Sequence, residues 1–550
     1  MTGVSGGSLF RVVTSIPDML AADPSVRINT AALRQAIVFA FAAGGSQDVF
    51  DDLVAGARLP ASPWDKGDFA RDVYLDDMVA RCFEVRVAGK TLPGNQRWLA
   101  RVLGEPPADG RDVDVRRDVL RELAASAPLR EDLGRVVLLV VRLRGLLATA
   151  RPLSARGRRI EILRTAREAF ELLAASFDGA TSALSRLRAF GCEIVESDAH
   201  RRLVQLLEHD DHQGSIDLKV RIGADGEVRA MQIVRVEEDR SSPFHVSALR
   251  RFFSRLALFF RGYRLTAGEV AERLLTEVLA GIEEPVALLF QVLGDAEVML
   301  ASLSFRDRAQ EQGLAMSLPE LIGVGEGQGE MVLEGLFNPL LLAAGVRPVA
   351  CDVRAAPGAV VVVTGPNSGG KTRFLQALAI AQLLSCAGFY APVATGRVPR
   401  APGLFASLYE EPRPDAPEGH LGMELLRIRR LFERLEVGSV VVLDELCSGT
   451  NPSEGEEIAQ LVLSLLPELG VQAFVTTHLL QFAARLASEK SIPASDFLQV
   501  ELDAHERPTY RFVPGVAKTS LAQRTASRLG VTREELLERI AAKRRSPLSS

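Results

Sequence analysis

Cysteine is scarce in this chain of 550 residues, and the few cysteines lie far apart. No pair has the C-x-x-C spacing, so neither a zinc site nor a disulfide framework is expected. The N-terminus has no basic start followed by a long apolar run, so we expect no signal peptide. No uninterrupted apolar stretch is long enough to span a bilayer, and residues 377–394 come nearest. We therefore expect a cytoplasmic protein without a membrane partner. The cysteines are Cys82, Cys192, Cys351, Cys386 and Cys447.

An excess of positive charge is also absent. The formal net charge is −5, so the whole chain has no electrostatic signature of nucleic-acid binding, although local basic patches remain possible. Hydrophobic residues make up 47% and charged residues 25%, as in soluble globular proteins. A chain of this length exceeds one ordinary core, and about two to four domains are expected.

The most informative stretch is residues 359–372, with the sequence AVVVVTGPNSGGKT. Its run of valines predicts a buried strand of a parallel sheet. The following residues fit G-x-x-x-x-G-K-[ST], the P-loop that binds phosphates, and residues 374–384 have a helical period. A chance glycine-rich turn is the alternative, but the strand before and the helix after favour the P-loop. The predicted nucleotide-binding residues are Gly365, Pro366, Asn367, Ser368, Gly369, Gly370, Lys371 and Thr372.

A second apolar strand, residues 439–443, ends in two acids. This is the Walker B pattern, in which Asp444 would hold Mg²⁺ through water and Glu445 would polarise the attacking water. Thr372 is the second predicted Mg²⁺ ligand, because a hydroxyl follows the P-loop lysine. A strand that ends in an ordinary polar turn is the alternative, and the neighbouring P-loop argues against it. ATP and Mg²⁺ are thus the expected cofactors.

Together these motifs resemble the ATPase domain of the MutS family. The resemblance rests on residues 365–371, 444–450, 454–455 and 476–478, and it extends over a closing segment to cover about residues 330–545. The sequence NPSEG at residues 451–455 favours the second MutS subfamily, which lacks a mismatch-reading domain. The closing segment is carried by Tyr510, Arg511, Phe512, Gly515, Ser520 and residues 528–530.

The resemblance implies roles for further residues. It implies an ATPase that dimerises and closes around DNA, with Lys371 and Glu445 as catalytic residues. His478, at the end of a short apolar strand, would contact the γ-phosphate, and Val349 and Phe512 would approach the adenine. Phosphate transfer to water needs positioning and charge stabilisation above all, which these residue types supply.

Two positions depart from the family pattern. Residues 419–424, GHLGME, contain no hydroxyl where the family has a serine–threonine segment that reaches the partner's γ-phosphate. Activation across the dimer by a serine is therefore in question. Cys447 stands where glycine is usual, and we interpret it as a small space-filler rather than a reactive thiol.

The chain before the ATPase domain is expected to be mainly helical. Residues 1–72 form a segment of unknown role, with a helix at 31–43 capped by Asn29 or Thr30 and a loop at 60–63. Residues 73–322 resemble the MutS core and lever domain more weakly, and an ordinary helix-turn-helix stays an alternative. Long helices are predicted at residues 133–147, 160–177 and 183–209, with a last helix from Arg533 capped by Thr532. The core-like segment is carried by residues 74–76, 83–85 and 97–99, Pro106 and Arg116.

A β-hairpin is predicted near residues 216–236, where apolar and polar residues alternate on both sides of a glycine turn. Family members carry a DNA-gripping clamp at this place. A DNA contact and a solvated face are equally compatible with its basic residues, Lys219, Arg221, Arg229 and Arg235.

Two further patterns favour a structural interpretation. Arginines and aromatic residues alternate at 250–264, which suits nucleic acid but is more typical of a packed amphipathic helix. The two histidines of residues 209–212 enclose two acids, which is more typical of a solvated turn than of a metal site.

We therefore expect a helical core and lever domain followed by an α/β P-loop ATPase domain at residues 330–545. The predicted function is that of a MutS-like ATPase whose homodimer clamps double-stranded or branched DNA, in mismatch repair or recombination. An ATP-dependent protein-interaction switch without a DNA role is the alternative. A transporter subunit is disfavoured because the Leu-Ser-Gly-Gly-Gln signature is missing. We expect no mismatch-reading domain before residue 73 and no nuclease module after the last helix.

Overall fold

The computed structural model describes residues 14–148, 155–211, 215–222, 228–237, 267–323, 329–408, 419–446, 451–518, 531 and 533–545. They fall into two compact units. Unit 1 is drawn from Met1–Arg58, Val87–Lys90 and Arg121–Glu297, and unit 2 from Leu59–Arg86, Thr91–Leu120 and Val298–Ser550. The chain thus passes repeatedly between the units, whereas the three consecutive domains expected from the sequence stay a prediction.

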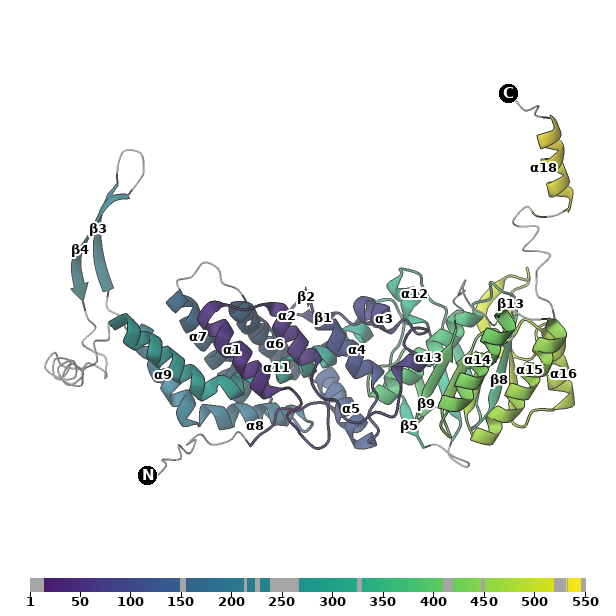
Figure 1. Cartoon of the computed structure of the whole chain (residues 1–550), viewed down its shortest axis with the longest axis horizontal. Coiled ribbons are helices and arrows are strands. Elements are labelled where there is room, and N and C mark those ends of the chain that lie inside the picture. Colours follow the sequence, from purple (N-terminus) through teal and green to yellow (C-terminus); the bar gives the residue numbers. More distant parts are fainter. Residues whose placement is uncertain are drawn as a thin grey trace. The chain divides into compact units, whose positions relative to one another are not determined.

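Unit 1 is largely helical, as the apolar spacing predicts (Figure 1). The expected first helix is α1, and the Asn29 side chain accepts the N–H of Ala32 as its N-cap. The helices α1, α6 and α7 pack on one another. Its first helices are α1 (Thr30–Ala43), α2 (Gln47–Ala55), α6 (Ala127–Ala148), α7 (Ala155–Ala175), α8 (Leu184–Val195) and α9 (Asp198–Asp211).

The single helix predicted at residues 183–209 is wrong, because α8 and α9 are separate helices. Ser197 lies at the break. Its hydroxyl donates to the Ile194 carbonyl at 2.6 Å and accepts the His200 N–H at 3.2 Å. A serine that satisfies a backbone donor at the start of a helix is an N-cap, so it starts a new helix here although the apolar period continues.

The longest helix, α11 (Ala267–Glu311), crosses the boundary between the units in the sequence. Its segment Leu274–Glu311 is long and apolar enough to cross a membrane, with a mean hydropathy of 1.7 over 18 residues, and that window is entirely buried. The stretch nearest to a membrane span is therefore this one and not residues 377–394. Complete burial within the protein is typical of the core helix of a soluble fold.

The predicted β-hairpin is confirmed as β3 (Ser215–Ile222) and β4 (Val228–Glu237), which pair antiparallel. Lys219 pairs with Gln232, and the register shifts at two places along the hairpin. The turn, the side chains of the hairpin and the arginine-rich residues 250–264 lie outside the described part of the chain, as does His212. Their predicted contacts stay predictions.

Unit 2 begins with short elements that pack on the ATPase domain. Residues 60–63 are irregular, as predicted, and the Trp64 indole N–H donates to the Ala401 carbonyl at 3.1 Å. Arg116, fully buried, donates to the Ala387 carbonyl at 2.9 Å. The elements are η1 (Lys66–Asp68), α3 (Leu75–Cys82), β1 (Val85–Val87), β2 (Lys90–Leu92), α4 (Gln96–Gly104) and α5 (Gly110–Ala125), of which β1, β2 and α5 extend across a unit boundary.

The centre of unit 2 is a six-stranded sheet in the order β10-β11-β12-β8-β13-β14. All neighbours are parallel except β13 and β14, so the predicted parallel sheet is confirmed. The valine strand β8 lies between β12 and β13, where both of its faces are covered. The strands are β8 (Val360–Thr364), β10 (Leu404–Ser407), β11 (Val440–Leu443), β12 (Gln472–Thr476), β13 (Ser495–Leu502) and β14 (Pro508–Pro514).

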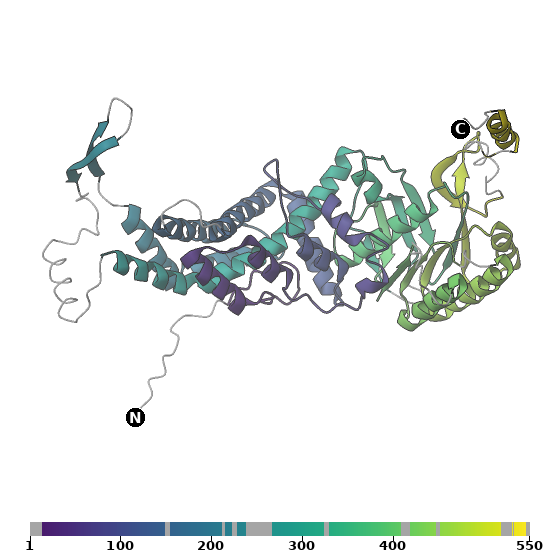
Figure 2. The ribbon, with the colours of Figure 1, turned by 45° about the horizontal axis from the view of Figure 1, so that its top comes forward.

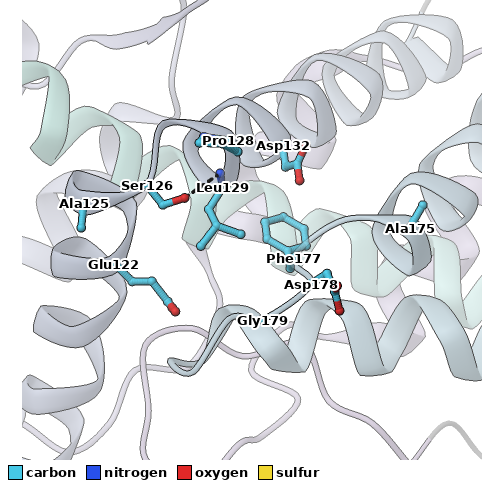
Figure 3. Close-up of a pocket in the computed structure, with 10 residues that line it drawn as sticks. All are labelled: Glu122, Ala125, Ser126, Pro128, Leu129, Asp132, Ala175, Phe177, Asp178 and Gly179. Carbon is cyan, nitrogen blue, oxygen red and sulfur yellow. Dashed lines mark hydrogen bonds between the residues drawn. The ribbon is translucent and has the colours of Figure 1, made fainter.

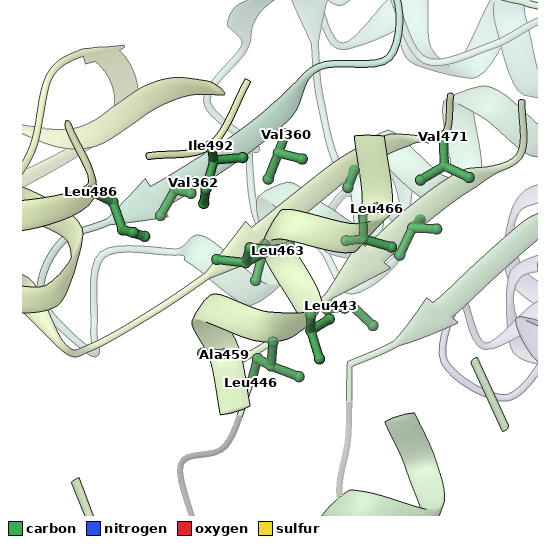
Figure 4. Close-up of a cluster of buried hydrophobic side chains, with 14 of the residues drawn as sticks. Val360, Val362, Leu443, Leu446, Ala459, Leu463, Leu466, Val471, Leu486 and Ile492 are labelled. Carbon is green, nitrogen blue, oxygen red and sulfur yellow. The ribbon is translucent and has the colours of Figure 1, made fainter. Parts of the chain in front are cut away.

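Helices cover both faces of this sheet (Figure 2). Apolar side chains of α14, α15 and α16 form one core with Val360 and Val362 of β8 (Figure 4). The P-loop helix α13 packs over β10, β11 and β12 without contributing to that core, which places it on the other face. The helices of unit 2 from residue 339 onward are α12 (Pro339–Ala343), α13 (Lys371–Ala387), α14 (Gly419–Arg434), α15 (Pro452–Leu465), η2 (Leu466–Leu469), α16 (Leu480–Glu489) and α18 (Arg533–Arg545).

A smaller four-stranded sheet, in the order β5-β9-β6-β7, completes unit 2. Its strand β7 contacts β14 at the edge of the large sheet. The predicted last helix is confirmed as α18, while its predicted cap, Thr532, lies outside the described residues. The strands are β5 (Glu320–Ile322), β6 (Met331–Leu336), β7 (Cys351–Ala355) and β9 (Thr395–Pro399).

Candidate nucleotide site

The P-loop connects β8 to α13, as its sequence predicts. Two of its glycines have backbone angles that other residues avoid, with φ of 141° at Gly365 and 86° at Gly370. A Cβ atom on Gly365 would lie 2.6 Å from the Val500 side chain. Gly370 precedes α13 without a side-chain cap, so the first N–H groups of this helix are directed toward the loop, where they suit an anion.

Lys371 is buried within this loop, with 4% of its surface exposed. Its ammonium donates to the carbonyls of Gly365 at 3.0 Å and Pro366 at 3.3 Å. Burial lowers the pKa of Lys371, and the negative charges of Glu445 and Asp444 oppose that decrease. The cation is thus held by neutral carbonyls, which leaves its charge available to a phosphate group.

Asp444 follows β11, and each of its carboxylate oxygens accepts a hydrogen bond from a hydroxyl group. Thr372 donates to Oδ2, and Thr476, from the end of β12, donates to Oδ1. Within the part of the chain that the structure describes, no three His, Cys, Asp or Glu side chains form a metal cluster. The adjacent hydroxyl of Thr372 and carboxylate of Asp444 nevertheless fit Mg²⁺, which takes few protein oxygens and completes its shell with water and phosphate.

Glu445 is half-buried next to Asp444 and has a left-handed backbone, with φ of 49°. Its N–H donates to the Thr476 hydroxyl at 2.9 Å. This backbone conformation costs roughly 1 kcal/mol or more for a residue other than glycine. Such a conformation persists only where the surrounding structure determines it.

His478 lies exposed just after β12. The N–H of its neighbour Thr477 donates to the Val363 carbonyl at 3.1 Å, so the ends of β12 and β8 are joined directly before the histidine and the P-loop. The carboxyl ends of parallel strands meet at one edge of the sheet, and this edge brings Lys371, Asp444, Glu445 and His478 together. The role of His478 stays a prediction, since its imidazole has no hydrogen bond to the other three side chains in the described site.

The residues predicted near the adenine lie in two places of unit 2. Phe512, on β14, stacks on Phe374 in the first turn of α13, with ring centroids 4.1 Å apart and an interplanar angle of 27°. Val349 precedes β7 and is 40% exposed. At the tip of the loop Asn367 and Ser368 are exposed as well. Phe374 was not among the predicted residues, although its place just after the P-loop could have indicated it.

A buried amide network supports the first turns of α13, and the sequence did not reveal it. The Asn338 side chain donates to the Arg373 carbonyl at 2.9 Å and to Gln376 at 3.0 Å. Gln376 donates in turn to the Asp72 carbonyl at 3.1 Å, and the Asp72 carboxylate accepts the Leu408 N–H at 2.6 Å. In the sequence, this network is indicated only by polar residues that stand within apolar stretches.

The two positions that depart from the family pattern lie next to or among the residues that the structure does not describe. Residues 419–424 form the first turns of α14, where Glu424 is buried and pairs with Arg427 at 3.4 Å. Cys447 and residues 448–450 lie outside the described part of the chain. The predicted effects of the missing hydroxyl and of Cys447 therefore stay predictions.

A separate hollow of about 510 Å³ opens in unit 1 (Figure 3). The carboxylates of Glu122 and Asp178, which line it, already have partners within the protein. Glu122 accepts the N–H groups of Thr181 at 2.7 Å and Ser182 at 3.1 Å, and Asp178 pairs with Arg188. These contacts hold the segment between α7 and α8 on α5 and on α8, so the acids have a structural explanation.

Comparison with known proteins identifies the C-terminal domain. Residues 361–544 match the model of MutS domain V, which is an ATPase domain. Endonuclease MutS2 of Thermus thermophilus is 32% identical over 206 residues, which are 38% of this chain and 27% of that protein. Endonuclease MutS2 of Pelotomaculum thermopropionicum is 32% identical over 287 residues, or 50% of this chain and 34% of that protein.

The mitochondrial DNA mismatch repair protein MSH1 of Arabidopsis thaliana is 26% identical over 286 residues, or 50% of this chain and 25% of that protein. The chain thus spans about a quarter to a third of the length of these relatives. The resemblance predicted from the motifs is confirmed for the α/β domain at the C-terminus.

Proposed function

We propose that this chain, whose residues 361–544 form a MutS-type ATPase domain, hydrolyses ATP and uses the cycle to close and reopen a homodimeric clamp on DNA. The observation that carries the ATPase proposal is the meeting of a P-loop lysine, a hydroxyl-bound aspartate and a glutamate at one edge of the parallel sheet. These are the groups that phosphoryl transfer to water requires.

The residues have distinct tasks in hydrolysis. The N–H groups at the start of α13 bind the phosphates, and the Lys371 ammonium turns from its two carbonyl partners toward the outer phosphates. Glu445 orients the attacking water and accepts its proton, while His478 contacts the γ-phosphate from the neighbouring strand end. Thr372 and Asp444 would hold Mg²⁺, which neutralises phosphate charge when it is bound.

The DNA part of the proposal rests on the relatives and on the hairpin. The relatives carry names that refer to an endonuclease and to DNA mismatch repair. The hairpin β3–β4 supplies Lys219, Arg221, Arg229 and Arg235, which are suited to phosphate contacts. We also propose that the protein acts in the cytoplasm without a membrane, since the one helix among the described residues that is long and apolar enough to cross a membrane is buried in that window.

An ATP-dependent switch that binds a protein and no DNA is the second candidate. The net charge of −5 is the observation in its favour, because DNA-binding proteins more often have a basic surface. Both candidates share the ATPase site, so only the response to DNA separates them.

The experiment is a measurement of the ATPase rate with and without matched, mismatched and branched DNA of one length. The DNA clamp predicts that at least one DNA changes the rate, and Lys371→Ala is the control for contaminating activity. A rate that no DNA changes, together with no DNA binding at low salt, supports the protein switch instead. Turnover equal in the wild type and in Lys371→Ala removes the ATPase proposal itself.

The same DNA series tests specificity. Phosphate contacts by basic side chains position a protein but carry no sequence information, so we expect binding that depends strongly on salt and is indifferent to a single G·T mismatch. A tenfold preference for the mismatch, roughly 1.4 kcal/mol, would show that the chain contains a base-reading element.

A further inference from the structure

The last residue of β12, Thr476, occupies an unusual place in the site. It is completely buried, and its strand lies between β11 and β8. The pairing of β11 with β12 sets Leu443 beside Val475, so Asp444 and Thr476 follow next to each other in parallel register. On the other side Thr476 pairs with Val363, two residues before the P-loop glycine Gly365.

The Thr476 hydroxyl makes two hydrogen bonds to the acidic pair. It donates its only proton to Oδ1 of Asp444 and accepts the N–H of Glu445 at 2.9 Å. A hydroxyl has one donor and two acceptor positions, so both bonds can form at once. The Thr372 hydroxyl donates to the other oxygen of Asp444. The carboxylate is therefore bound by residues of two elements, α13 and β12.

These two bonds act on different features of the site. The first fixes the rotation of the Asp444 carboxylate, and with it the direction of the oxygen that faces Thr372. The second anchors the peptide between Asp444 and Glu445, where Glu445 has its left-handed φ of 49°. A conformation of this cost persists only where its surroundings determine it, and here the hydroxyl of the adjacent strand supplies part of that constraint.

We propose that Thr476 is a positioning residue for hydrolysis, which sets the backbone and the direction of Glu445 and the rotation of Asp444 through its hydroxyl. This inference rests on the proposed ATP hydrolysis. Thr476 is completely buried and its hydroxyl bonds to Asp444 and Glu445, so its removal should lower kcat more than nucleotide affinity. The phosphate-binding groups, Lys371 and the start of α13, belong to another loop and stay in place.

The test compares Thr476→Val with Thr476→Ser. Valine keeps the volume and removes both hydrogen bonds, while serine keeps the hydroxyl. We expect Thr476→Val to lower kcat by about 10- to 100-fold, as the loss of partners that orient a site residue commonly does. The affinity for a fluorescent ATP analogue should change by less than about threefold, since binding is not the step affected. Serine should restore kcat to within about threefold of the wild type by the same measure.

Thr165→Val is the matched control. Thr165 is also completely buried, and its hydroxyl donates to the Glu161 carbonyl at 2.8 Å within α7 of unit 1. The same chemical change at this position should leave kcat unaltered. Should valine at 476 prevent folding, Thr476→Ala and Thr476→Ser provide the comparison, because only serine retains the hydroxyl.

The outcomes separate this inference from the proposed function. Native kcat in Thr476→Val, or equal losses in the valine and serine variants, would overturn the role of the hydroxyl while the ATPase stands. A parallel loss of analogue binding in Thr476→Val would overturn positioning as the mechanism. No turnover by the wild type would instead remove the proposed function on which the inference depends.

Discussion

Each unit contains a buried basic residue near two carboxylates, and the two groups are built in opposite ways. In unit 1, Arg27 pairs directly with Asp18 at 3.2 Å and with Asp295. In unit 2, the Lys371 ammonium binds two carbonyls, while the nearby Asp444 binds two hydroxyls. In the first group the opposite charges contact each other directly, whereas in the second they are held apart by carbonyl and hydroxyl partners.

The unit 1 group has the features of a structural connection. Asp18 and Asp295 are completely buried, and Asp295 also accepts the Met19 N–H at 3.1 Å. The nearby Gln291 accepts the Arg27 N–H at 2.8 Å, so the segment around Arg27 is held on α11 by both backbone and side chains. Arg27 and both carboxylates are thus bound within the protein, in a buried place.

The unit 2 group keeps its charges apart beside the P-loop, whose tip residues Asn367 and Ser368 are exposed. Burial of a lysine without an ion pair carries a desolvation cost, which appears as the lowered pKa of Lys371. A bound phosphate would offset that cost. The comparison indicates that separated charges mark a binding site and directly paired charges mark a structural one, and four predictions test this.

Lys371→Ala should have the largest effect. It removes the charge that phosphate needs, so kcat/KM should fall on the order of 10⁴-fold or more through loss of both binding and transition-state stabilisation. Stability should change little, because the ammonium binds only loop carbonyls. Steady-state phosphate release and tryptophan fluorescence measure the two properties. Unfolding of this variant under native conditions would show that the lysine is structural after all.

Glu445→Gln should abolish water activation while binding persists. The amide keeps the shape of the side chain but cannot accept the proton, so kcat should fall by about 10²- to 10⁴-fold. ATP should remain bound, and the proposed closed dimer should accumulate in size-exclusion chromatography with ATP. Hydrolysis at the native rate would assign the water to another group, with His478 next in line.

Arg27→Met should destabilise unit 1 and leave the ATPase site intact. Removal of one partner leaves two buried carboxylates without a counter-charge, which costs about 3 to 5 kcal/mol. Both tryptophans, Trp64 and Trp98, lie in unit 2. The unfolding transition followed by helical circular dichroism should therefore shift to a lower urea concentration. The midpoint of the transition followed by tryptophan fluorescence should not change.

The control for this variant is Arg34→Met in the same unit. Arg34 pairs with Glu283 but its side chain is 45% exposed, and such pairs contribute under about 1 kcal/mol. Equal destabilisation by the two variants would contradict the distinction between the buried group and a surface pair.

The pH dependence of unit 1 should show the smallest effect. Burial raises the pKa of Asp295 to about 6, although Arg27 opposes the increase. A carboxyl with a raised pKa binds a proton more tightly in the folded state, so its contribution to stability is greatest below pH 4 and is lost as the pH rises toward 6. The effect is on the order of 2 to 3 kcal/mol.

Many other carboxylates titrate in this range, so the measurement is a difference. Urea unfolding followed by circular dichroism between pH 4.5 and 7.5 should show Asp295→Asn gaining stability relative to the wild type as the pH rises. Asp178→Asn, at an exposed aspartate paired with Arg188, is the control and should show no such trend. A stability difference between Asp295→Asn and the wild type that stays constant over this pH range would contradict the raised pKa of Asp295.

The linear motifs made the ATPase domain predictable. The valines of β8, the glycines at Gly365 and Gly370, and the acids after β11 follow from local rules about buried strands, backbone angles and phosphate binding. The break between α8 and α9 was missed because the apolar period continues through Ser197, whose hydrogen bonds form only once both helix ends are in place.

The sequence by itself determined where the P-loop lies and that a parallel sheet would present it, since the motif and its flanking strand and helix are contiguous. Only the tertiary structure decided which distant groups meet. Arg27 and Asp295 are 268 residues apart, and Asp444 and Thr476 are 32 apart. No local pattern specifies such pairs, because strand order and helix packing bring them together after the chain has folded.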